Sequence, residues 1–67
     1  MEIKLNNQKK ELPEQCNIQQ LMDLLIPDKQ KGIAVAVNNT VISKNNWQKH
    51  SLLQNDEVLI INATQGG

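Results

Sequence analysis

A single amphipathic segment in the first half of the sequence limits the chain to folds with one main helix. Its apolar residues recur at i, i+3, i+4 and i+7, the spacing of one helix face: Ile18, Leu21, Met22 and Leu25. Asn17 can accept from the free amides of the first turn, and Gln20, three residues later, can reach back to it in a capping box. Pro27 disfavours helical geometry at the residue before it, which predicts the end of the helix. We therefore expect a short helix whose stripe faces the core.

The residues before this helix have the pattern of a β-hairpin. Residues 2–5 alternate polar and apolar, which is the period of a half-buried strand. Residues 6–8, Asn-Asn-Gln, form a turn cluster, and residues 10–12 can return as a second strand. Pro13 then ends the ladder because it has no amide hydrogen to donate.

A second hairpin is predicted after the helix. Residues 33–37, Ile-Ala-Val-Ala-Val, place large side chains on one face of a strand and alanines on the other. Asn38 and Asn39 tolerate the left-handed backbone angles of a tight turn, so residues 40–43 can pair back across it.

The last third of the chain predicts a short helical turn and a final strand. Residues 45–53 are expected to contain the turn, with Trp47 as a core anchor because it is the only aromatic side chain in the sequence. Residues 57–62 form the last strand. Hairpins on either side of one helix favour an α+β fold, with a mixed sheet of four to five strands and the helix packed across one face.

Length and composition exclude several classes of function. With 67 residues the chain fits one domain, which has little stability to spare for a walled enzyme pocket, so a surface or a terminus is the better candidate for its function. Seven basic and seven acidic residues, with no arginine and one aromatic ring, make nucleic acid an unfavoured partner.

The cysteine content and the apolar runs predict the compartment. One cysteine rules out an internal disulfide, which is ordinary in a reducing compartment. The sequence shows no secretory leader, and its longest apolar run, residues 33–37, is too short to cross a bilayer. We expect a cytoplasmic protein with no membrane partner.

The sequence ends in two glycines that make its terminal carboxylate a candidate working group. Gly66 and Gly67 lack Cβ atoms, so this end is slim, can adopt any backbone angle and can enter a narrow channel, with Gln65 just before it. A flexible tail of residues 63–67, fully extended, would reach about 17 Å beyond the last strand. That distance would bring the carboxylate into a partner's active site while the domain stays outside.

The sequence as a whole resembles the ThiS family, the sulfur carrier proteins of thiamine biosynthesis. The resemblance covers the whole chain and rests on Val-Ala-Val-Asn at 35–38, Trp47, Asn-Asp-Glu-Val at 55–58, and Gly66-Gly67. It implies a single ubiquitin-like β-grasp domain over residues 1–67, with its tail at 63–67.

The resemblance also implies chemistry that is performed by partner enzymes. An E1-like adenylyltransferase of the ThiF type would use ATP and magnesium to convert the Gly67 carboxylate into an acyl adenylate. Sulfur from a cysteine desulfurase persulfide would then displace AMP and leave a thiocarboxylate, which donates its sulfur to thiazole synthase of the ThiG type. The carrier itself would bind no cofactor and would not be an enzyme.

Strand periodicity predicts a docking patch near the tail. If Val58 and Ile60 face the helix, the alternate residues of the last strand lie on the outer face of the sheet beside the small residues of the 33–37 strand. The predicted patch consists of Leu59, Ile61, Ala34 and Ala36. An apolar patch of this kind marks a partner site, unless a loop or an oligomer contact covers it.

Cys16 and His50 are the remaining candidates for chemistry. No neighbouring base or cation lowers the pKa of Cys16, so a bystander thiol is expected. One cysteine and one histidine lack the ligand spacing of a metal site, and a Cys16–His50 nucleophile pair would lack the bulk to enclose a substrate.

Three alternatives to the thiazole sulfur carrier stay open at this point. The small subunit of molybdopterin synthase also ends in Gly-Gly and forms a thiocarboxylate, although it is usually longer. A ubiquitin-like modifier or binding module would use the same fold without sulfur, and a small enzyme using Cys16 comes last. A thiocarboxylate on Gly67 separates the two carriers from the other two, and the acceptor protein separates the carriers from each other.

Overall fold

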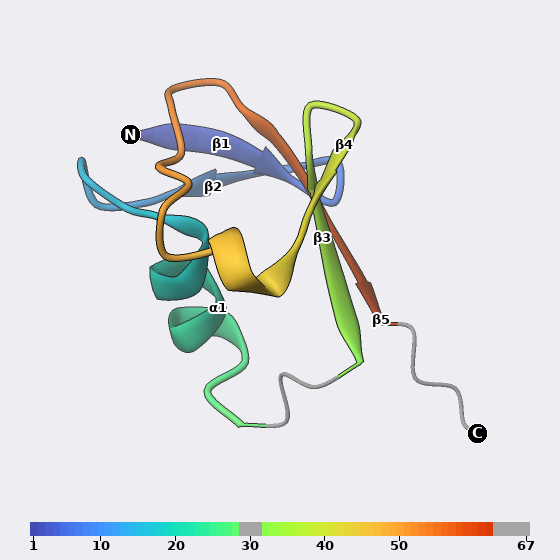
Figure 1. Cartoon of the computed structure of the whole chain (residues 1–67). Coiled ribbons are helices and arrows are strands. Elements are labelled where there is room, and N and C mark those ends of the chain that lie inside the picture. The colour runs from blue at the N-terminus through green and yellow to red at the C-terminus, as the bar shows by residue number, and fades with distance from the viewer. Residues whose placement is uncertain (29–31, 63–67) are drawn as a thin grey trace.

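The computed structural model describes residues 1–28 and 32–62, which form one mixed β-sheet with one α-helix on one of its faces (Figure 1). The elements in chain order are β1 (Glu2–Leu5), β2 (Gln8–Glu11), α1 (Ile18–Leu25), β3 (Ile33–Val37), β4 (Thr40–Ile42), the 3-10 turn η1 (Lys44–Asn46) and β5 (Glu57–Asn62). The prediction of an α+β fold with one main helix is confirmed, and the sheet has five strands.

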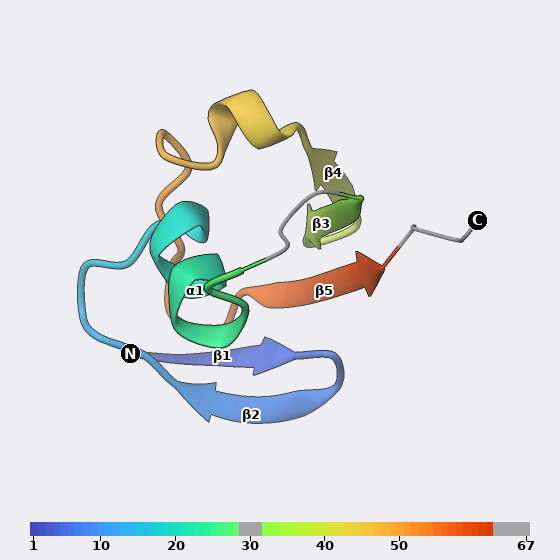
Figure 2. The same cartoon turned by 90° about the horizontal axis from the view of Figure 1, so that it is seen from below.

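The strand order places the last strand in the centre of the sheet. The order is β2-β1-β5-β3-β4, with β1 and β5 parallel and every other pair antiparallel. Viewed along the sheet, α1 lies on the side toward which the strands curve (Figure 2). This is the β-grasp arrangement, in which two hairpins flank the helix and the final strand runs between them.

Both hairpins turn through pairs of asparagines in the left-handed region. Asn6 and Asn7 have φ of 48° and 71°, and Asn38 and Asn39 have φ of 51° and 72°. Asparagine tolerates these angles, which two-residue hairpin turns require. Because the first turn uses only two residues, Gln8 pairs directly with Leu5, and the second strand ends at Glu11 instead of running over residues 10–12 as predicted.

The helix begins and ends where the sequence predicts. The Asn17 side chain accepts from the Gln20 amide, and the Gln20 side chain accepts from the Asn17 amide, at 2.8 Å and 2.9 Å. Ile26, the residue before Pro27, leaves helical geometry with φ of −136°. No helix in residues 1–28 and 32–62 has the length and apolar character needed to cross a membrane.

The core lies between α1 and the inner face of the sheet and is closed on one side by Trp47. Eleven buried side chains form it: Ile3, Leu12, Cys16, Ile18, Leu21, Met22, Val35, Val37, Trp47, Leu52 and Val58. Trp47 follows η1, is 1% exposed, and donates from Nε1 to the Ile42 carbonyl at 3.1 Å. Its predicted role as a core anchor is confirmed, and the helical turn that precedes it spans residues 44–46.

Candidate functional site

The candidate site begins where β5 ends. β5 is the central strand of the sheet, and its last residue is Asn62. The predicted tail residues Gln65, Gly66 and Gly67 lie outside the described residues, and their role stays a prediction. The described part of the site is therefore the strand before the tail and the sheet face around it.

An apolar surface lies on the outer face of the sheet beside the end of β5. In the antiparallel register, Ala34 pairs with Ile61 and Ala36 pairs with Leu59, so the four predicted residues share one face. Leu59 and Ile61 are 44% and 47% exposed, whereas Ala36 is buried and forms the floor between its neighbours. Val35 and Val58, at alternate positions, are buried in the core on the opposite face.

Val41 extends this surface onto β4 and was not among the predicted patch residues. It pairs with Ala36 across the second hairpin and is 67% exposed, so Val41, Ala36 and Leu59 form one row across three strands. The two-residue turn at Asn38 and Asn39 implies this register, and counting outward from the turn would have found the position. We call the five residues Ala34, Ala36, Val41, Leu59 and Ile61 the outer patch.

The start of β5 is anchored to the β3–β4 turn by a polar cluster. The backbone amide of Asn38 donates to the Glu57 carbonyl at 2.8 Å, and the Asn38 side-chain oxygen accepts from the backbone amide of Glu57 at 3.0 Å. The Asp56 carboxylate, 8% exposed, accepts from Asn38 Nδ2 at 3.0 Å and from the Leu53 amide at 2.8 Å. These contacts fix where the strand that leads to the tail enters the sheet.

Cys16 has the environment of a structural thiol. It is 3% exposed within the core, and its Sγ donates to the Asn17 carbonyl at 3.6 Å. Burial raises the pKa of the Cys16 thiol, which keeps it protonated and weakly nucleophilic at neutral pH. This environment agrees with the expected bystander role.

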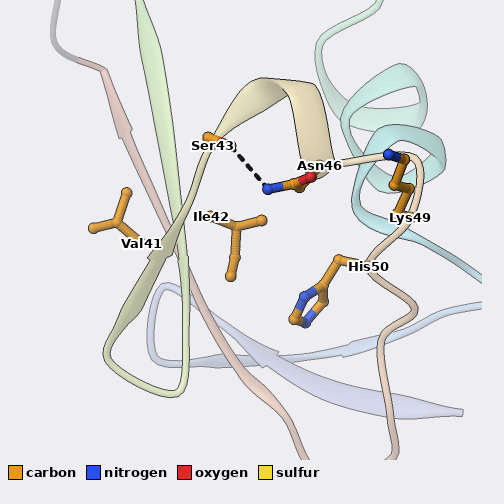
Figure 3. Close-up of a pocket in the computed structure, with 6 residues that line it drawn as sticks. All are labelled: Val41, Ile42, Ser43, Asn46, Lys49 and His50. Carbon is orange, nitrogen blue, oxygen red and sulfur yellow. Dashed lines mark hydrogen bonds between the residues drawn. The ribbon is translucent and has the colours of Figure 1, made fainter.

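His50 belongs to a different place, a surface hollow of about 420 Å³ between β4 and the segment after η1. Its lining residues are Val41, Ile42, Ser43, Asn46, Lys49 and His50. Figure 3 shows the imidazole projecting from the loop toward the β4 side, with Asn46 Nδ2 donating to Ser43 Oγ at 3.1 Å. No thiol or carboxylate is among these lining residues, so the hollow does not join Cys16 to His50.

No group of three or more His, Cys, Asp and Glu side chains comes together as a metal site within residues 1–28 and 32–62. The features that the described residues do offer are a central strand, β5, that ends at Asn62, and an exposed apolar face beside it. This arrangement suits presentation of the tail to a partner.

The topology and the position of β5 define a ubiquitin-like β-grasp protein. The particular family follows from the sequence: the chain belongs to the ThiS family, whose model matches residues 1–67. A solved structure, the thiamine biosynthesis protein ThiS from Geobacter metallireducens, superposes with a TM-score of 0.86 at 19% identity, covering 100% of both chains. At that identity the superposition supports the fold alone. No curated protein sequence matches the chain.

Proposed function

We propose that this protein is a sulfur carrier in thiamine biosynthesis and that it carries the sulfur as a thiocarboxylate on Gly67. The observation that supports this proposal most directly is the ThiS family match over the whole of residues 1–67. The fold adds support, because it ends its central strand immediately before the Gly-Gly tail.

The proposed chemistry begins with activation of a poor electrophile. A carboxylate resists nucleophiles, so an oxygen of the Gly67 carboxylate first attacks the α-phosphorus of ATP, and pyrophosphate leaves. The resulting acyl adenylate is a mixed anhydride whose AMP group departs readily. ATP and magnesium are substrates and cofactor of the partner adenylyltransferase, of the E1-like ThiF type, and not of this chain.

Sulfur then replaces AMP at the carbonyl carbon of Gly67. With sulfide as the donor, the sulfur attacks the carbon, the C–O bond to AMP breaks, and a thiocarboxylate remains. With a cysteine desulfurase persulfide, the same attack gives an acyl disulfide, whose S–S bond a thiol must then reduce. The thiocarboxylate is the nucleophile that thiazole synthase, of the ThiG type, would accept.

The outer patch is the proposed docking face for these partners. Its side chains Leu59 and Ile61 are exposed on the strand that leads to the tail. Surfaces that expose aliphatic side chains and contain few charged residues are typical of the cores of protein interfaces. A partner bound to this face would have its active site within the roughly 17 Å that five extended residues can reach. The carrier's contribution is binding and presentation of Gly67, and the chemical groups come from the partner.

We infer a cytoplasmic location because this chemistry uses ATP and thiols kept reduced.

The test is the intact mass of the protein after incubation with a ThiF-type adenylyltransferase, ATP, magnesium and sulfide. We expect a gain of about 16 Da, the difference between oxygen and sulfur, located at the terminal carboxylate. A variant lacking Gly67 is the matched control and should show no gain. An unchanged mass with an adenylyltransferase that is active on its own carrier would contradict the proposal.

A further inference from the structure

The two strands that flank β5 pair with different lengths of it. On the β3 side the ladder continues to the end of the strand, where Ile33 pairs with Asn62. On the β1 side the ladder ends at the pairing of Leu5 with Val58. The last four residues of β5, which lead directly to the tail, therefore have no strand on that side within the described chain.

One side chain continues the β1 side of the ladder. Asn6, the first residue after β1, donates its backbone amide to the Val58 carbonyl at 2.9 Å. Its side-chain Oδ1 accepts from the Ile60 amide at 2.8 Å. In a continued parallel ladder, the Ile60 amide would pair with the backbone carbonyl of Asn6 itself, so the side-chain carboxamide takes the place of that carbonyl.

The backbone of Asn6 explains why a side chain makes this contact. With φ of 48°, Asn6 turns the chain into the first hairpin, so its own carbonyl cannot continue the ladder. Asparagine combines tolerance of this left-handed angle with an amide oxygen of the right reach. The result is a two-point clamp on β5, at Val58 and at Ile60.

We propose that Asn6 is a positioning residue that sets the direction in which the carrier tail leaves the sheet. This inference rests on the proposed function and assigns a part of it to a residue remote in sequence from the tail. The clamp lies two residues before the end of β5, and a strand held on one side only can twist and bend more freely. The clamp thus acts on the strand that immediately precedes the segment carrying Gly67.

Loss of the clamp should affect presentation of the tail more than docking. Leu59 and Ile61 keep their pairing with Ala36 and Ala34 on the β3 side, so the outer patch survives. The expected change is therefore a lower kcat for adenylation with an unchanged KM, because a misdirected carboxylate reaches the reactive geometry less often.

The chain offers matched variants. Asn6→Gly keeps the left-handed turn and removes the amide oxygen, whereas Asn6→Asp keeps an acceptor for the Ile60 amide. Asn7→Gly is the control, because Asn7 lies in the same turn with φ of 71° and makes no side-chain hydrogen bond within the described residues. N6G and N7G thus make the same substitution in the same turn, but only N6G removes the hydrogen bond to the Ile60 amide.

The experiment measures ATP–pyrophosphate exchange with a ThiF-type adenylyltransferase, at a temperature where circular dichroism shows each variant folded. Hydrogen exchange of the Ile60 amide, followed by NMR, reports the clamp itself. We expect N6G to speed exchange at Ile60 and to lower kcat by roughly three- to tenfold at constant KM, with N6D and N7G within about twofold of the parent.

Two outcomes would overturn the assignment while leaving the carrier function intact. One is a parent protein that is adenylated and an N6G variant that matches it in kcat despite faster exchange at Ile60. The other is an N7G variant that loses as much activity as N6G, since the turn and not the side chain would then be responsible. A parent protein that is never adenylated would instead contradict the proposed function, and the positioning role with it.

Discussion

Asn38 donates its side-chain amide to the buried carboxylate of Asp56 at 3.0 Å, and this contact joins the β3–β4 turn to the start of the central strand. Both side chains also make a second hydrogen bond, in which Asn38 Oδ1 accepts from the Glu57 amide and Asp56 Oδ2 accepts from the Leu53 amide. Two loops that are distant in sequence are thereby held against the strand that leads to the tail.

Asp56→Asn is expected to destabilise the protein. Both carboxylate oxygens of Asp56 accept hydrogen bonds, whereas an asparagine has one acceptor and one donor, so one of the two contacts would become donor against donor. Because Asp56 is only 8% exposed, water cannot readily replace the lost contact. We expect the free energy of unfolding to fall by about 1–3 kcal/mol, measured by urea denaturation.

The neighbouring acid provides the control for this substitution. Glu57 is exposed, and only its backbone joins the cluster. Glu57→Gln should change the free energy of unfolding by less than about 0.5 kcal/mol. If the two substitutions cost the same, the charge of this region and not the buried contact would be responsible.

Trp47→Phe tests the anchor that closes the core. The indole Nε1 donates to the Ile42 carbonyl at 3.1 Å, and phenylalanine keeps an aromatic ring but loses this donor and some volume. We expect a loss of about 1–3 kcal/mol in the free energy of unfolding, followed by circular dichroism. Leu53→Ala, at a 67% exposed position, should cost less than about 0.5 kcal/mol, and a larger loss there than at Trp47 would contradict this account.

The buried thiol predicts a loss of stability at alkaline pH. Burial raises the pKa of Cys16 in the folded state, so the folded protein holds this proton more tightly than the unfolded chain does. The stabilising contribution is complete below the pKa of the unfolded thiol, about 8.5, and is lost as pH rises through the folded pKa. The same burial should make Cys16 react with a thiol reagent at least about a hundredfold more slowly in the native protein than in urea.

Comparison with Cys16→Ala isolates this effect. The hydrogen bond to Glu11 raises the pKa of the Met1 ammonium, so this group also adds a loss of stability as the pH rises. The alanine variant keeps that contribution, so the difference between the two pH profiles reports the thiol alone. Parallel profiles above pH 8.5 would show that Cys16 makes no such contribution.

The elements that follow from local patterns were predictable from the sequence, and the contacts between them were not. The capping box at Asn17 and the turn at Asn38 and Asn39 depend on residues close in sequence, and the structure confirms both. The predicted second strand, residues 10–12, differs from the observed one, residues 8–11. Asn6 and Asn7 form the whole turn, and the polar residues that follow do not show where strand pairing resumes.

The outer face could be derived from period two alone, since alternate residues of a strand must lie on opposite faces. The contact between Asn6 and Ile60 could not, because it joins residues 54 positions apart and depends on the parallel register of β1 and β5. The burial of Asp56 has the same origin: its partner Asn38 belongs to another hairpin, and nothing local to residues 55–57 indicates the contact.

The outer patch leads to the last prediction, which concerns partner binding. Leu59→Lys places a charge in the middle of the patch while leaving the backbone pairing of β5 with β3 in place. Burying that charge against a partner would cost binding energy, so we expect the Kd for a ThiF-type adenylyltransferase, measured by calorimetry, to rise at least about tenfold. The free energy of unfolding should change by less than about 1 kcal/mol, because Leu59 is 44% exposed in the folded protein.

Leu24→Lys is the matched control, at a 62% exposed leucine on α1 on the other side of the sheet, and should leave the Kd within about twofold. Equal affinities for the parent and the Leu59→Lys variant would remove the outer patch from the docking surface, and weaker binding by the Leu24→Lys variant alone would place the partner on the helix face instead.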